Sequence, residues 1–533
     1  MEPHVSLLPL AAVGVPVVTA VLIGFARRVP DLRDALLVLG AVATFACVAA
    51  LVPAVLAGET PTTPLGELLP GVELALTADG TGMVFAGLAS LLWVLASIYA
   101  IGYMRGDAAA NQTRFYAFYA LCLSTAFGVA FAADLFTFFV FYELLTISTY
   151  PLVTHKGDAK AIAAGRTYLG FLVSGGAAVL FGLVIVFSVT GEVAFVAGGF
   201  VGDALGTGLT IVVFALFAIG FGTKAGLMPL HRWLPRAMVA PTPVSALLHA
   251  VAVVKAGVFA FGRLIGFVFG PEVLAGIGVQ QVLTAVAGAT VVIASIVALR
   301  QDHLKRRLAY STIAHLAIIV LGFSVLSPQA YEGGLLHIFN HGMLKITLFF
   351  CAGAIHIAAH KDHVSQLNGI GRRMPFTMIA FAVAAYGLAA LPPMGGFVSK
   401  WFLVLGAIEA GEYLVAGIIV FSGIFTAGYL FPIVYRAFFR APGIEVAPVV
   451  IHTGAPVPAG ILHDPATPVV PVTTPAAVPP AADVHDAHGE APAFMVVPLC
   501  TTAAIAVLLG LGDLTGLYAV ARAVGTAVFG GLP

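Results

Sequence analysis

Long apolar runs, separated by short polar stretches, recur along this 533-residue chain. About 20 apolar residues in a helix cross the hydrocarbon core of a bilayer, so each run is expected to form one membrane span. The pattern predicts fourteen spans, at residues 5–26, 35–57, 80–103, 114–132, 135–154, 165–190, 207–240, 242–262, 281–299, 308–326, 334–359, 375–410, 413–437 and 493–511. The chain is therefore predicted to be an all-α polytopic membrane protein.

Two of these spans contain a lysine beside helix-breaking residues. The stretch GFGTKAGLMPLHRWLPR at 220–236 places Lys224 next to glycine and proline, and YGLAALPPMGGFVSKWFL at 386–403 does the same for Lys400. A charge at the bilayer centre costs at least ~3 kcal/mol, and irregular backbone there is tolerated only where it lines a protein-enclosed cavity. Interrupted spans in corresponding halves of a membrane protein indicate a transport site.

Composition agrees with a membrane protein, since 60% of the residues are hydrophobic and only 9% are charged. A soluble globular chain has about 25% charged residues. The first apolar run, Val5 to Phe25, lacks the short charged start and cleavage site of a signal peptide and is expected to be retained. The four cysteines lie far apart inside apolar runs and are expected to be small buried hydrophobic residues: Cys47, Cys122, Cys351 and Cys500.

Basic residues alternate between successive loops. The odd-numbered loops hold nineteen of the 25 lysines and arginines, whereas the even-numbered loops and the tails hold two. The positive-inside rule then predicts that both termini lie outside the cytoplasm. The segment 441–492 is predicted to be a cytoplasmic linker rich in proline and alanine, and its irregularly spaced histidines favour a solvated chain over a metal site. No function is assigned to the external connection at 58–79.

The remaining ionisable residues fall inside the predicted spans: Lys224, Lys255, Lys345, Lys400 and Glu143. Ionisable groups within a membrane are expected to pair and to mark an ion or proton path. Lys224 is the expected partner of Glu143. The alternative is an ion pair that only fixes helix packing, because buried pairs are weak evidence for stability.

Histidines extend this set. His337, His341 and Lys345 are spaced four and four, which places them on one helix face as a proton relay. His249 and Lys255 are six residues apart and are expected to serve neighbouring parts of the path. His315 and His356 are weaker candidates. A zinc site is disfavoured because no third ligand lies on the helix of His337 and His341. No cofactor is predicted, because nucleotide-binding, haem and iron–sulfur motifs are missing from the sequence.

Five motifs resemble a known family: FYELL around Glu143, TKAGLMPLHRWLPRA with APTPVSALLH at 223–249, LKRRLAYSTIAH at 304–315, LLHIFNHGMLKITLFF at 335–350, and LPPMGGFVSKW at 391–401. The family is the antiporter-like one shared by Mrp-type multisubunit Na⁺/H⁺ antiporters and the proton-pumping membrane subunits of respiratory complex I. The resemblance implies a fourteen-helix core with two inverted five-helix repeats, each with a broken helix.

The resemblance also implies a role for each matching residue. Glu143 and Lys224 would form a gating ion pair, and Lys255 with His249 the central connection. His337, His341 and Lys345 would relay protons onward to Lys400, the terminal site. The implied divisions are an N-terminal segment at 1–112, repeats at 113–263 and 264–440, the linker at 441–492, and a last helix with its tail at 493–533.

Length and Lys400 make the chain most similar to the Mrp D subunit. The leading hypothesis is a proton-translocating subunit of a cation/proton antiporter in a bacterial inner membrane. It would exchange Na⁺ or another monovalent cation, with other hydrophobic subunits as partners and no nucleic acid. As a transporter subunit it would not itself be an enzyme. One alternative is a proton-pumping subunit of a complex I-like dehydrogenase or membrane-bound hydrogenase. Another is a structural scaffold.

Overall fold

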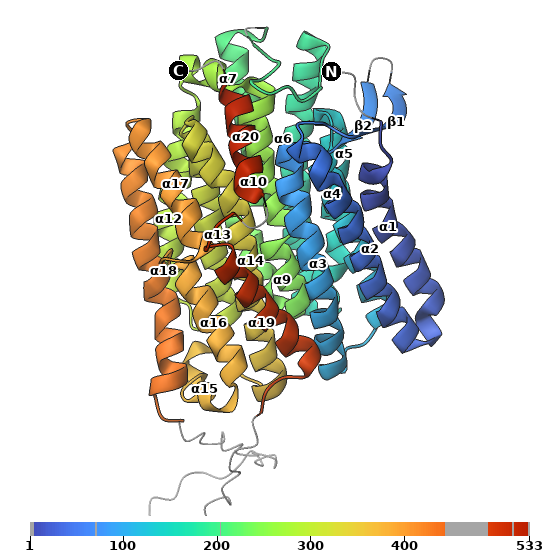
Figure 1. Cartoon of the computed structure of the whole chain (residues 1–533), viewed down its shortest axis with the longest axis vertical. Coiled ribbons are helices and arrows are strands. Elements are labelled where there is room, and N and C mark those ends of the chain that lie inside the picture. Colours follow the sequence, from blue (N-terminus) through green and yellow to red (C-terminus); the bar gives the residue numbers. More distant parts are fainter. Residues whose placement is uncertain (1–4, 70–71, 203, 443–488, 514–515, 531–533) are drawn as a thin grey trace, which may run out of the picture.

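The computed structural model describes residues 5–69, 72–202, 204–442, 489–513 and 516–530, and the predicted linker at 441–492 lies almost wholly outside them. Helices dominate the described residues, as predicted (Figure 1). The first half contains α1 Leu8–Phe25, α2 Pro30–Leu56, α3 Gly80–Gly106, α4 Gln112–Phe131, α5 Leu135–Val153, α6 Ala159–Thr190, α7 Gly206–Ala225, α8 Trp233–Arg236, α9 Thr242–Ala250 and α10 Val253–Arg263. The second half contains α11 Pro271–Ile277, α12 Gln280–Arg300, α13 Leu304–Ser324, α14 Pro328–Ala359, α15 Ile370–Arg373, α16 Pro375–Leu388, α17 Gly395–Glu409, α18 Tyr413–Phe439, α19 Ala493–Leu508 and α20 Leu517–Phe529.

Polar residues in the loops fix where several helices begin. The carboxylates of Asp79, Asp134 and Asp158 accept hydrogen bonds from backbone N–H groups in the first turns of α3, α5 and α6. Such caps satisfy amide groups that a helix leaves unpaired at its N-terminus. The apolar runs that follow then continue as helices across the membrane.

Twelve segments among the described residues are long and apolar enough to cross a membrane. The other two of the fourteen predicted spans consist of shorter helices. The span 375–410 divides into α16 and α17 at the proline–glycine stretch, as expected. The last span is the 16-residue helix α19. Helix α20, which the apolar pattern did not single out, follows α19.

The span predicted as one helix at 242–262 is interrupted, and this expectation was wrong. Helix α9 ends at Ala250, and α10 begins at Val253 after two residues with non-helical dihedral angles. A π-helix, Leu264–Phe269, then continues α10. Neither glycine nor proline marks this break, so the sequence carries no local signal for it.

The external connection at 58–79 folds into an antiparallel hairpin of β1 Thr62–Leu69 and β2 Val72–Thr77. It is tied to the α4–α5 connection, because Ala133 donates its backbone N–H to the Ala75 carbonyl at 3.1 Å. The hairpin, the start of α1 and the end of α20 all lie at the upper end of the molecule in Figure 1. The two ends of the described chain therefore lie on the same side.

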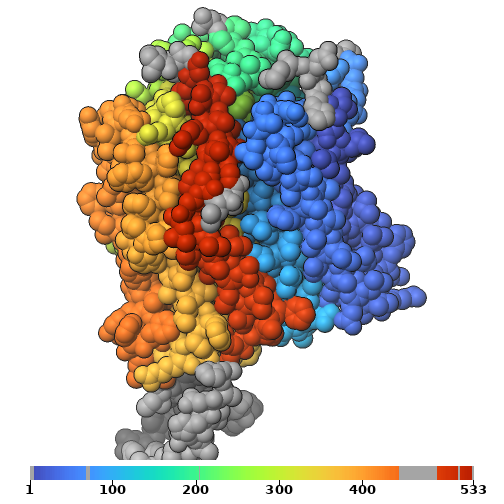
Figure 2. All heavy atoms as spheres, in the orientation of Figure 1, coloured from blue at the N-terminus to red at the C-terminus, as the bar shows by residue number. Residues whose placement is uncertain are grey.

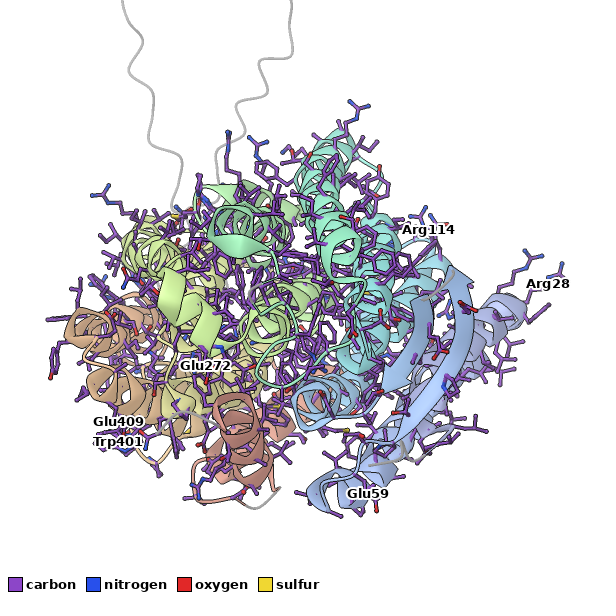
Figure 3. The ribbon with its side chains drawn as sticks, turned by 90° about the horizontal axis from the view of Figure 1, so that it is seen from above. Arg28, Glu59, Arg114, Glu272, Trp401 and Glu409 are labelled. Carbon is purple, nitrogen blue, oxygen red and sulfur yellow. The ribbon has the colours of Figure 1, made fainter. Side chains whose placement is uncertain are left out.

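Burial separates interior helices from peripheral ones. The most apolar window of residues 242–269 is 100% buried and that of α13 is 94% buried, whereas that of α2 is only 33% buried. Helices α13, α14 and α9–α10 thus form the centre. Seen from above, Glu59 and Arg28 lie toward the edge formed by α1 and α2, and Trp401 and Glu409 lie at the opposite edge (Figure 3). Because charges are costly beside lipid, the interior helices are where ionisable side chains can be accommodated.

Helices α19 and α20 cross one face of the bundle. Both contact α3 and α14, which lie far from them in the sequence. Figure 2 shows them as a continuous diagonal band between the N-terminal helices and the α16–α18 region. They therefore cover part of α14, the helix that carries most of the predicted relay.

Candidate functional site

Lys224 lies at the end of α7, directly before the first helix break. Its side chain is 1% exposed, and its ammonium donates to the backbone carbonyl oxygen of Tyr142 on α5. The same nitrogen is 3.3 Å from the centroid of the Tyr142 ring, a cation–π contact. Gly226 ends the helix with a positive φ of 74°, a conformation that glycine adopts without steric cost. The break therefore places a buried cation against α5.

Glu143 follows Tyr142 on α5 and packs against Gly176 of α6. Its Oε1 atom is buried and has no hydrogen-bond partner among the described residues. The salt bridges between described residues do not include one between Glu143 and Lys224. The expected partners are thus neighbours without a direct ion pair, because the Tyr142 carbonyl and ring take the ammonium of Lys224.

Lys255 and His341 form the first link of a second polar group in the molecular centre. Lys255 Nζ on α10 is 2.9 Å from His341 Nδ1 on α14, and both side chains are 0% exposed. The ring of His341 stacks on the ring of His315 from α13 with centroids 5.3 Å apart. A lysine and two histidines from three different helices thus meet inside the bundle.

His315 lies at a branch point. Its Nδ1 hydrogen-bonds His337 Nε2 at 3.1 Å, and its Nε2 hydrogen-bonds Thr426 Oγ1 at 3.3 Å. His337 continues to Ser399 on α17 through a 2.8 Å hydrogen bond. Ser399 is the residue before Lys400, so this arm approaches the second helix break.

The other arm runs through hydroxyl groups. Thr426 Oγ1 is 2.9 Å from the hydroxyl of Tyr429, which accepts a hydrogen bond from Ser311 at 2.9 Å. Lys345 donates to the same Ser311 hydroxyl at 2.7 Å. This arm therefore joins Lys345 to His315 through three side chains.

Lys400 is also tied to this arm. Its ammonium donates to Ser422 Oγ at 2.8 Å, and Thr426 donates to the Ser422 backbone carbonyl at 2.7 Å. We call the whole set the central network, defined by Lys255, Ser311, His315, His337, His341, Lys345, Ser399, Lys400, Ser422, Thr426 and Tyr429. Every member except Lys400 and Ser422 is at most 1% exposed, and these two are 5% and 2% exposed.

His249 does not belong to the central network. Its ring stacks on Phe349 with centroids 4.7 Å apart, and neither ring nitrogen has a hydrogen-bond partner among the described residues. The sequence-predicted stripe on α14 is likewise divided, since Lys345 bonds to Ser311 on α13 rather than to His341. His356, a weaker candidate, hydrogen-bonds Asp362 in a loop at 3.0 Å, away from the network.

An apolar layer separates Lys224 from the central network. A Cβ atom on Gly257 of α10 would overlap the backbone of Lys224 and Ala225, so α7 and α10 are in close contact. The rings of Phe138 and Phe259 stack nearby with centroids 6.4 Å apart. No hydrogen bond between described residues joins Lys224 to Lys255. The structure therefore contains two polar centres, one at Lys224 and one around His315.

The sequence analysis underrated His315 and missed the hydroxyl groups. A usable signal exists: Ser422, Thr426 and Tyr429 are spaced four and three on α18, and Ser311 and His315 are spaced four on α13. These spacings place each set on one helix face. Single serines and threonines are common in membrane helices, so only the facing histidines identify these as parts of a network. No group that could hold a metal ion is found among the described residues.

The chain matches a family model described as "NADH:quinone oxidoreductase/Mrp antiporter, TM" over residues 132–426. It is 33% identical to NADH-quinone oxidoreductase subunit N of Desulforudis audaxviator, covering 83% of this chain and 82% of that protein. It is also 33% identical to a K⁺/H⁺ antiporter protein of Rhizobium meliloti, covering 70% of this chain but only 38% of that longer protein. In structure it is similar to a chain of the Mrp complex from a Dietzia species, with a TM-score of 0.80, 24% identity and coverage of 98% and 97%.

Proposed function

This chain belongs to the NADH:quinone oxidoreductase/Mrp antiporter transmembrane family, and we propose that it is the proton-translocating subunit of a multisubunit cation/proton antiporter. Its relatives are membrane subunits of multisubunit assemblies, which supports hydrophobic partner subunits. The exchanged cation in this proposal is Na⁺ or another monovalent cation. The proposed location is the bacterial inner membrane, with both termini outside the cytoplasm. The division into two inverted five-helix repeats stays a prediction.

The central network carries this proposal. Proton transfer needs donor and acceptor atoms within hydrogen-bond distance of one another, about 2.6–3.2 Å apart. The links from Lys255 to His341, from His315 to His337, and from Lys345 to Ser311 lie within that range. Lysine and histidine can both gain and lose protons, and hydroxyl groups can pass a proton by accepting one and donating another. The network thus supplies a proton path between Lys255 and Lys400.

The Lys224 centre has a different role in the proposal. Glu143 and Lys224 act as a gating pair, because a carboxylate that approaches an ammonium favours its charged form. The apolar layer between Lys224 and Lys255 means that protons cross this step only when water or a side-chain movement connects the two centres. The broken backbone after α7 offers free polar groups that can recruit such water.

A second candidate function is a subunit of a redox-driven proton pump. The observation that favours it is the 33% identity to an NADH-quinone oxidoreductase subunit N over 83% of this chain. The same network would conduct protons in that case. The energy would come from a redox partner instead of a cation gradient.

Flux measurements with purified subunits test the proposal. The intact complex is reconstituted into vesicles, and a pH-sensitive dye reports proton movement after a Na⁺ or K⁺ pulse. The wild type is expected to exchange protons for the cation, and Lys400→Ala is expected to assemble normally but lose exchange. Loss of assembly in Lys400→Ala would instead indicate the scaffold function. Co-purification with iron–sulfur or quinone-binding subunits, together with no cation-driven flux, would indicate the redox-driven pump.

A further inference from the structure

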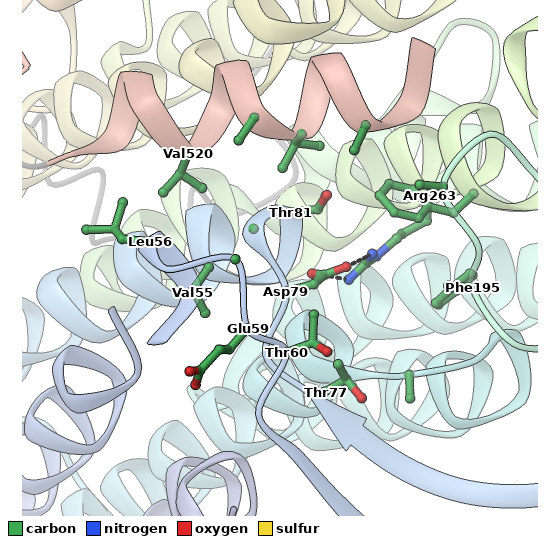
Figure 4. A pocket seen from close by; sticks show the side chains of 18 of the residues that line it. Val55, Leu56, Glu59, Thr60, Thr77, Asp79, Thr81, Phe195, Arg263 and Val520 are labelled. Carbon is green, nitrogen blue, oxygen red and sulfur yellow. Dashed lines mark hydrogen bonds and ion pairs between the residues drawn. The ribbon is translucent and has the colours of Figure 1, made fainter. Parts of the chain in front are cut away.

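A cavity of ≈ 470 Å³ opens at the hairpin end of the molecule, away from the central network. The lining includes Asp79 and Arg263, threonines of the 58–79 connection, and one face of α20 (Figure 4). Asp79 directly precedes α3 and Arg263 ends α10. The cavity therefore lies where membrane-spanning helices begin and end, at the depth of lipid headgroups.

The polar wall of the cavity favours a cationic group. Arg263 donates to both carboxylate oxygens of Asp79, one of the two bonds measuring 2.8 Å. Its guanidinium is enclosed by the rings of Phe195, Phe259 and Phe267, with centroids at 5.1, 5.2 and 4.8 Å. The Arg263 side chain is 3% exposed, whereas the Asp79 side chain is 23% exposed. The carboxylate, not the guanidinium, is thus the charged group that a ligand can reach.

The charges of the lining point the same way. Glu59, Asp79 and Arg263 are the charged side chains that line the cavity, which gives it one net negative charge. Each carboxylate oxygen can accept more than one hydrogen bond, so Asp79 can bind an ammonium group while it remains paired with Arg263. A positively charged headgroup therefore complements this end of the site.

An apolar groove of ≈ 240 Å³ continues from the cavity toward the membrane centre. Val55 and Val520 line both spaces, so they adjoin. The groove runs between α2, α3 and α20, and Phe339 of the relay helix α14 forms part of its wall. We call the cavity and the groove together the α2–α20 site.

The length of the groove matches one leaflet of a bilayer. Along α2 its lining extends from Val55 to Phe45, ten residues that span about 15 Å at the helical rise of 1.5 Å per residue. The hydrocarbon core of a bilayer is about 30 Å thick, so one leaflet contributes about 15 Å. A helix about 10 Å across fills on the order of 400 Å³ in each turn, so a partner helix does not fit in the groove.

We propose that the α2–α20 site binds one phospholipid with an ammonium headgroup, of the phosphatidylethanolamine type. The ammonium group lies at the Asp79 carboxylate, and one acyl chain lies in the groove against Phe339. Because Phe339 lies between His337 and His341 in the sequence of α14, the lipid packs on the outer side of the helix that carries the relay. This binding site is independent of which cation the complex exchanges.

Lipid retention tests the proposal on the intact complex purified in mild detergent. After extensive washing, bound phospholipids are extracted and identified by mass spectrometry. Gly87→Leu fills the groove, since the nearest atom to a Cβ at this position is Phe339 Cε2 at 4.0 Å. Retained phosphatidylethanolamine is expected to fall about ten-fold or more, because the groove no longer buries an acyl chain. Gly170→Leu, on α6 with nothing within 4 Å, is the matched control and is expected to retain lipid as the wild type does.

Two further measurements decide what occupies the site. A photoreactive phenylalanine analogue at position 339 is expected to form an adduct with the mass of a phospholipid. An adduct with a co-purifying subunit would overturn the proposal, and so would equal lipid retention in Gly87→Leu and wild type. Headgroup preference is measured by adding back phosphatidylethanolamine or phosphatidylglycerol to washed complex. Preferential uptake of the anionic phosphatidylglycerol would contradict the assignment of Asp79 as the headgroup ligand.

Discussion

Lys255 and His341 are 86 positions apart in the chain, yet Lys255 Nζ lies 2.9 Å from His341 Nδ1. This pair joins α10, which follows an unpredicted helix interruption, to α14, which carries the predicted relay. A charged Lys255 donates to Nδ1, and a neutral one can accept a proton from it. One proton can therefore be shared between the two side chains.

Replacing Lys255 by methionine is expected to lower proton flux by a factor on the order of 100, the usual range for loss of a positioned proton-transfer group. Methionine keeps most of the buried volume, so the complex should still assemble. Flux in reconstituted vesicles is the measurement. Lys160→Met, at an exposed position on α6, is the control and should leave flux unchanged. Wild-type flux in Lys255→Met would show that protons bypass this pair.

His315 is expected to be as important as His337. Substitution of His315 by alanine removes the links to both His337 and Thr426. Because the two histidines act in one connected path, the His315→Ala/His337→Ala double variant should lose no more flux than the more damaged single variant. The comparison uses initial rates of dye quenching in vesicles with equal amounts of assembled complex. Multiplicative losses would indicate two separate paths.

Gly176 is expected to position Glu143. A Cβ at this position would overlap the Glu143 carboxylate. The overlapped atoms are the end of a flexible side chain, so Gly176→Ala should move the carboxylate at a cost of about 1 kcal/mol or less in folding stability. Proton flux should nevertheless fall, because the gating group is displaced. Gly170→Ala, on the same helix with open space around it, should keep full flux. Equal flux in the two variants would argue against a role for Glu143.

The ion pair of Asp79 and Arg263 is expected to stabilise the hairpin end of the molecule. Asp79→Asn keeps a good N-cap residue for α3 but leaves the buried guanidinium without an anionic partner. Breaking such a pair costs about 3 kcal/mol or more. Thermal unfolding in detergent measures the loss. The double variant Asp79→Asn/Arg263→Met should be more stable than Asp79→Asn alone, and the opposite order would refute this explanation.

Asp362 should make stability depend on pH in the acid range. The hydrogen bond from His356 is the main cause that lowers the pKa of Asp362 to about 2. A lowered pKa means that this carboxylate stabilises the folded chain above its unfolded pKa of about 3.9, and that the contribution is lost as the pH falls toward about 2. Asp362→Asn should therefore lower the melting temperature at pH 7. The difference from wild type should shrink below about pH 4, and a pH-independent difference would contradict the assignment.

The apolar pattern predicted nearly all of the fold because lipid exposure imposes a simple rule on each helix. Both breaks beside Lys224 and Lys400 were marked by glycine and proline, and both were found. The interruption between α9 and α10 was not, because Val251 and Ala252 carry no helix-breaking chemistry. The hairpin at 62–77 was missed since tertiary contacts to the α4–α5 connection, not alternating polarity, hold it in place.

The identity of the site was less accessible than the fold. Buried charge and histidine spacing named Lys255, His337, His341, Lys345 and Lys400, which the structure brings into one network. The same spacing suggested that Lys345 continues the histidine stripe, but it bonds to Ser311 instead. Glu143 and Lys224 were paired as the nearest opposite charges, whereas the Tyr142 carbonyl and ring take the ammonium.

The amino-acid sequence by itself determined which segments cross the membrane, where two of them break, and which ionisable residues must be buried in protein. These properties follow from the free energy of each segment in lipid, which needs no knowledge of its neighbours. Only the tertiary structure decided which buried groups meet, and it made His315 the branch point between Lys255, Lys345 and Lys400. Helix periodicity gives the face on which a side chain lies, but the rotation and depth of the facing helix are set by packing between residues far apart in the chain.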